Sequence, residues 1–133
     1  MGKSLTDAFS LVAASRNKKM GGLFSSFTPL PQEKVIKLQN LLKDALENDA
    51  QVQENFNIKT AVLAALVQLI HYKDEPEKIT SPVYGNKDGR IMTDPLDVDK
   101  AHTIGYNTYE NPERPKILKN MQRSLYKDLK KHL

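Results

Sequence analysis

The feature that most constrains the fold is the segment Ile58–Ile70, which is apolar on almost every side when drawn as a helix. A helix that is apolar all round needs neighbours on several sides, so this segment is expected in the middle of a helical domain. It cannot span a bilayer, because that takes about 20 consecutive apolar residues. Asn57 precedes the segment and is expected to cap the start of this helix.

Amphipathic helices are expected to pack around this segment. Over 31–48, apolar residues recur at helical spacing, and Pro31 is a favourable first-turn residue. Over 113–132, a second apolar stripe recurs at the same spacing. Together with a helix over 57–72, these segments form the principal helices of the predicted domain, and a short helical piece is expected over 50–55.

The N-terminal residues 1–28 are expected to form an arm with one short helix, capped by Ser4 or Thr6. Two glycines follow this helix, and after them comes a stretch that contains Phe24 and Phe27. The stretch is apolar enough to lie on a surface rather than in solvent. We therefore assign its two phenylalanines to a protein interface.

The helical domain is expected to cover 29–133 and to contain a long irregular loop over 73–112, where prolines and glycines interrupt every periodic pattern. Within it, Val83–Met92 predicts a short hairpin with Gly89 at the left-handed bulge position. A loop this long in a small domain is usually functional or ordered by a partner. The predicted fold is mainly α: a small three- to four-helix domain with an N-terminal helical arm and a long irregular loop carrying a short β-hairpin.

Positive charge is concentrated in the last predicted helix. Residues 113–133 carry seven basic and two acidic residues, whereas the middle of the chain is net acidic. On a helical projection, the cations fall within an arc of about 120°. They are Lys116, Lys119, Arg123, Lys127, Lys130 and Lys131. The opposite side is apolar, so this helix is expected to dock by one face and to present a positive field on the other.

Three interpretations of this basic face follow from its composition. It can be the solvated face of a docked helix, a phosphate-binding surface or a contact for an acidic protein surface. Sequence-specific DNA reading is not expected, because no turn-helix context supplies base-reading side chains. Non-specific contact with nucleic-acid phosphates would depend strongly on salt.

Three tyrosines lie at wide spacing in the long loop: Tyr84, Tyr106 and Tyr109. They could stack on nucleic-acid bases, but the segment around them is net acidic, which opposes phosphate. Tyrosine is also a common protein–protein anchor, because it buries a large area at little entropic cost. We therefore assign the three tyrosines to a protein interface.

The chain contains no cysteine and no recognisable nucleophile, metalloprotease or phosphate-loop motif. His102 follows Asp97 and Asp99 closely and is the base that we would nominate, together with Tyr106, for an enzyme. Asp94 and the same aspartates could hold a divalent ion, but an acidic loop cluster is more often solvated. We assign no catalytic residue, no metal ligand and no cofactor.

The leading hypothesis is a non-enzymatic protein-interaction protein, a small adaptor or accessory subunit of a larger assembly. The alternative is a nucleic-acid-associated protein that binds phosphates through its basic helix. The partners are expected to be proteins, in the cytoplasm or within an assembled particle, and no transmembrane segment is expected. Gly2 and Thr6 fit an N-myristoylation pattern, but Asp7 is a poor neighbour and lipidation is not expected.

Overall fold

The computed structural model of the chain describes residues 2–17, 26–85 and 102–132. Its fold is mainly α, which confirms the predicted fold class. The chain forms two compact units: Met1–Glu75 together with Glu113–Leu133, and Pro76–Pro112. This grouping differs from the boundary expected after residue 28, because the first helix belongs to the same unit as the other helices.

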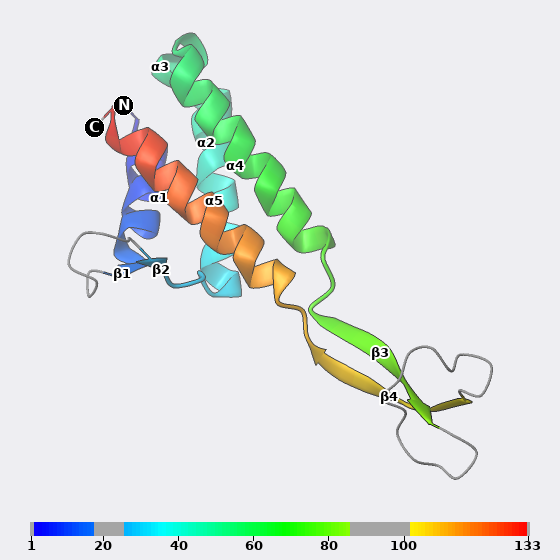
Figure 1. The fold of residues 1–133 in the computed structure, drawn as a ribbon. Coiled ribbons are helices and arrows are strands. Elements are labelled where there is room, and N and C mark those ends of the chain that lie inside the picture. The colour runs from blue at the N-terminus through cyan, green and yellow to red at the C-terminus, as the bar shows by residue number, and fades with distance from the viewer. Residues whose placement is uncertain (1, 18–25, 86–101, 133) are drawn as a thin grey trace. The chain divides into compact units, whose positions relative to one another are not determined.

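The described residues of the first unit form five helices and one pair of short strands (Figure 1). The helices are α1 (Lys3–Ala14), α2 (Gln32–Asn48), α3 (Ala50–Glu54), α4 (Phe56–Asp74) and α5 (Glu113–Lys130). The antiparallel strands are β1 (Arg16–Asn17) and β2 (Ser26–Phe27). The predicted principal helices are thus confirmed as α2, α4 and α5. Among the described residues, none of these helices has both the length and the apolar character needed to cross a membrane.

The helix starts differ from the predicted caps. Asn55, not Asn57, caps α4: its Oδ1 accepts hydrogen bonds from the backbone N–H groups of Asn57 at 3.0 Å and Ile58 at 3.2 Å. Helix α1 has no side-chain cap, and Ser4 lies inside it. The Ser4 hydroxyl instead donates to Asp44 of α2 and holds the pKa of that carboxyl below its ordinary value. Ser4 is not at the cap position, because the helix begins one residue before it.

The core lies between the helices and takes apolar side chains from all five of them. Helix α1 contributes Leu5, Ala8 and Val12, which are at most 1 % exposed, so α1 is part of the core rather than an outer arm. Helices α4 and α5 make the most extensive helix–helix contact. On α4, Ala61 and Ala65 are buried, and small side chains at a contact allow two helix axes to approach closely.

A buried glutamine fastens the chain after β2 to helix α5. Gln122 is 0 % exposed. Its Nε2 donates to Ser15 Oγ at 2.8 Å and to the Thr28 carbonyl at 2.9 Å, and its Oε1 accepts from the Leu30 N–H at 3.2 Å. Both donors and the acceptor of the amide therefore have partners, as a buried polar group requires.

The second unit contains an antiparallel ribbon of β3 (Lys78–Gly85) and β4 (His102–Glu110). A hairpin was predicted in this part of the chain, but its pairing differs from the prediction. Val83 pairs with Gly105 of β4 rather than with the stretch Arg90–Met92, which lies outside the described residues. The β-branched and aromatic residues of β4 favour a strand more strongly than the stretch Arg90–Met92 does.

The ribbon explains how a proline can lie within a strand. Each strand of a two-stranded ribbon keeps one edge without a neighbour, so Pro82 is tolerated although it has no N–H to donate. At the base of the ribbon, the backbone N–H of Asn111 donates to the Glu77 carbonyl, and its Nδ2 donates to the Pro76 carbonyl, both at 2.9 Å. Asn111 is 3 % exposed, so these hydrogen bonds hold the two ends of the unit together away from water.

Candidate functional site

The predicted cations are all exposed, five of them on α5 and Lys131 just after its end. They are Lys116, Lys119, Arg123, Lys127, Lys130 and Lys131. The other side of the helix enters the core through Leu118, Leu125 and Leu129. Lys130 contacts an aromatic ring, and the other five cations have no hydrogen bond or ion pair with any described residue. Their charge is therefore available to a partner.

Tyr126 organises the C-terminal half of this face. Its ring stacks on Phe9 with centroids 5.4 Å apart and packs at an angle against Phe27 at 5.7 Å. Arg16 Nη1 donates to the tyrosine hydroxyl at 3.2 Å, and Arg16 Cζ lies 5.1 Å from the ring centroid. Lys130 Nζ lies 5.6 Å from the same centroid. Two cations thus contact the same aromatic ring, since the electron-rich faces of the ring attract positive charge.

A surface hollow of about 610 Å³ lies beside this ring. It is lined by Arg123, Tyr126, Lys127, Lys130 and Lys131, and we call it the cationic hollow. None of its described lining residues is acidic. A concave surface with several cations concentrates positive potential and suits phosphate or carboxylate groups. Arg16, which contacts the same ring, has a buried Nε with no hydrogen-bond partner among the described residues.

The sequence pattern missed two members of this site. Tyr126 lies beside the predicted cations but was not assigned, and Arg16 reaches it across 110 residues of chain. Phe27 was assigned to a protein interface, but it is 2 % exposed because it packs against Tyr126 in the core. Phe24 lies outside the described residues.

The predicted tyrosines of the second unit lie on the surface of the ribbon. Tyr84 is 49 % exposed, Tyr106 69 % and Tyr109 48 %. Ile104, which is also on β4, is 44 % exposed. Tyr106 lies opposite Pro82, and Tyr84 follows Pro82 by two residues, so both tyrosines are on one side of the ribbon. Tyr109 is on the other side. We call these four exposed residues the ribbon aromatic set, although Ile104 is aliphatic.

The residues nominated for an enzyme are not brought together within the described part of the chain. Asp94, Asp97 and Asp99 lie outside the described residues. His102 begins β4. Tyr106 is exposed on the ribbon. These positions therefore add nothing to the enzyme hypothesis.

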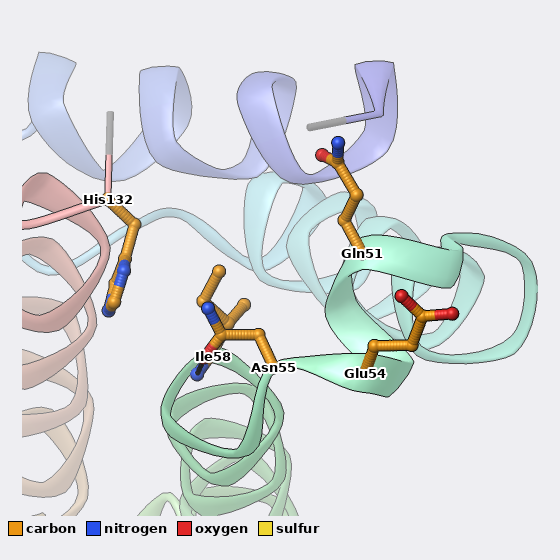
Figure 2. A pocket seen from close by; sticks show the side chains of 5 residues that line it. All are labelled: Gln51, Glu54, Asn55, Ile58 and His132. Carbon is orange, nitrogen blue, oxygen red and sulfur yellow. Dashed lines mark hydrogen bonds between the residues drawn. The ribbon is translucent and has the colours of Figure 1, made fainter.

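A second hollow, of about 590 Å³, lies at the start of α4 (Figure 2). Its lining residues are Gln51, Glu54, Asn55, Ile58 and His132. In Figure 2, Gln51 and Glu54 come from α3, and His132 reaches the hollow from the chain end beyond α5. The Oδ1 of Asn55 already accepts the capping hydrogen bonds of α4, so this lining residue has a structural role. One carboxylate and one imidazole on separate elements do not define a reaction.

Comparison with family models, curated proteins and solved structures gives no significant match to this chain. Function is therefore inferred from the two surfaces described above, the ribbon aromatic set and the cationic hollow.

Proposed function

We propose that the chain is a non-enzymatic interaction protein, an accessory subunit that binds a protein partner through its ribbon. The observation that carries this proposal is the exposure of the ribbon's apolar side chains. None of the described apolar side chains of β3 and β4 is buried, and the four of the ribbon aromatic set are 44–69 % exposed.

A two-stranded ribbon of this kind is marginally stable in water unless an apolar face packs against something. Tyrosines supply large contact areas, and the hydroxyl group can remain hydrogen-bonded at a wet rim. A protein surface that covers Tyr84, Tyr106 and Ile104 would bury the side chains that the ribbon leaves in solvent. This gain in buried area supports a protein as the partner of the ribbon.

The test is capture of the tagged full chain from cells that express it natively, with nuclease treatment. A stoichiometric protein partner is expected to survive the nuclease. The variant Tyr84→Thr/Tyr106→Thr places β-branched residues, which suit a strand, at both positions but removes two anchors, so it should lower the affinity at least ~30-fold. The purified partner and a binding titration measure this change.

The matched control is Thr80→Ser/Thr108→Ser, which alters the same ribbon and leaves the tyrosines in place. Its affinity should stay within about threefold of the native chain. Amide NMR signals of the strands check that the ribbon persists in both variants. Absence of a stoichiometric partner, or equal affinity of the two variants, would contradict the proposal.

A second candidate function, binding of nucleic-acid phosphates, is favoured by the cationic hollow. Its four cations stand around Tyr126 without an acidic neighbour in the described lining. Such a surface would bind the phosphate backbone without reading sequence.

The charge-neutralised variant Arg123→Gln/Lys127→Gln/Lys130→Gln tests this second function. If the hollow binds phosphates, the slope of log affinity against log salt should fall by about 2–3 for duplex DNA. The control Lys34→Gln/Lys37→Gln/Lys43→Gln removes the same charge from exposed positions on α2 and should change the slope by less than about 1. Equal slopes for the two variants would show that net charge alone, not the hollow, attracts the polyanion.

A further inference from the structure

Helix α4 carries a second apolar face that the helical unit does not cover. Phe56 is 79 % exposed, Leu63 41 %, Val67 59 % and Ile70 54 %. At 100° per residue, these four fall within an arc of about 60°. The buried residues of α4, such as Ala65, lie on the opposite side. We call the four exposed residues the α4 stripe.

The α4 stripe has the dimensions of a helix-pairing surface. From its first to its last residue it extends about 21 Å along the helix. It is a single narrow row, and α4 lies along one edge of the helical unit in Figure 1. A row of apolar side chains on one helix packs well into the matching groove of another helix. Four large apolar side chains on one exposed helix face are more than scattered surface residues, and they indicate an interaction site.

Two charges on the same side of α4 as the stripe indicate what kind of partner it fits. Lys59 lies near the N-terminal end and Asp74 near the C-terminal end, on the same side of the helix as the stripe. Both are exposed, and neither side chain has an ion pair or hydrogen bond with a described residue. From Lys59 to Asp74 the order along the helix is therefore positive, apolar, negative, and Phe56 lies about one turn before Lys59. This order is complementary to itself when two copies run antiparallel, whereas a parallel pair would place like charges together.

We propose that a second copy of this chain docks on the α4 stripe to form a symmetric antiparallel dimer. With the two-fold axis near Val67, Leu63 of each copy lies opposite Ile70 of the other, and Lys59 lies opposite Asp74. Phe56 lies outside the paired segment in this register, because the position opposite to it is beyond the end of α4. The interface is isologous, so each copy contributes the same residues to both halves. The proposal rests on α4 alone and is independent of the partners proposed for the ribbon and for the cationic hollow.

Analytical ultracentrifugation of the full chain over a wide concentration range is the first test. The native chain is expected to dimerise, and Val67→Glu should raise the dissociation constant at least ~30-fold because it places two carboxylates beside the axis. The control is Ile36→Glu, since Ile36 is a similarly exposed residue, at 46 %, on α2. Ile36→Glu should leave the dissociation constant within about threefold of the native value. A native chain that is monomeric throughout, or a dimer unchanged by Val67→Glu, would overturn the proposal.

A charge exchange tests the antiparallel register. Lys59→Glu and Asp74→Lys should each weaken the dimer about tenfold, and the double variant should restore it, because the two opposed charges are then exchanged together. Neither single variant should unfold α4: an acid near the helix start and a base near its end are favoured by the helix dipole. Failure of the double variant to recover the native dissociation constant would exclude this pairing of the two copies.

Discussion

Replacing Gln122 with leucine is expected to lower the free energy of unfolding of the helical unit by about 3 kcal/mol. The side chain is 0 % exposed and makes three hydrogen bonds, to Ser15, Thr28 and Leu30. Leucine has a similar size but leaves the buried Leu30 N–H and the part-buried Thr28 carbonyl without their partner. Each buried backbone group that loses its hydrogen bond costs about 1–3 kcal/mol.

Urea unfolding followed by helical circular dichroism measures this loss, with the slope of the transition checked for a constant value. The control is Asn120→Leu on the same helix, where the side chain is exposed and the expected change is within about 0.5 kcal/mol. A Gln122→Leu loss below about 1 kcal/mol would show that the three hydrogen bonds contribute little. In that case the chain after β2 is held by Phe27 and Leu30 in the core rather than by the amide.

The helices could be predicted because their signal is local and repeated. Helices α2 and α5 show apolar residues at helical spacing over several turns, and α4 shows a long run that is apolar on almost every side. The caps were harder, since several candidate residues lie next to one another and only tertiary contacts choose between them. Asn55 precedes Asn57 by two residues, and either could cap α4 by composition.

The ribbon's position could not be predicted because strands exposed on both sides lack a simple apolar alternation. In β3, intermediate residues alternate with exposed ones, but the exposed positions include Pro82 and Tyr84. The partner strand begins at His102, well beyond the turn signal at Gly89, so local turn chemistry pointed to the wrong pairing. Register in such a ribbon is set by interactions that a single short window does not contain.

The candidate sites, like the fold, were predictable where the signal is local and not where it depends on contacts between distant residues. The basic face of α5 was predictable because one helix encodes all its cations. The Arg16–Tyr126 contact was not, because its two halves are 110 residues apart. The apolar character of Ile58–Ile70 indicated neighbours on several sides, yet the structure leaves the α4 stripe exposed. The prediction that Ile58–Ile70 has neighbours on several sides would still hold if the neighbour on the side of the α4 stripe is another molecule.

A pair of adjacent alanines on α4 gives a direct test of which side of this helix faces the core. Ala65 is 3 % exposed, whereas Ala64 is exposed. The substitution Ala65→Leu adds three carbon atoms to a packed interior and is expected to cost about 1–3 kcal/mol of unfolding free energy. Ala64→Leu makes the same chemical change 100° round the helix and is expected to stay within about 0.5 kcal/mol.

The two variants share the change in helix propensity and in side-chain volume, so the difference between their unfolding free energies reports burial alone. Urea unfolding is measured at low protein concentration, where self-association through α4 does not contribute. A large difference is expected because α5 packs against α4 and small buried side chains permit its close approach. Equal losses of unfolding free energy in the two variants would mean that Ala65 is not on the side of α4 that faces the core. The α4 stripe would then not be the free face of the helix.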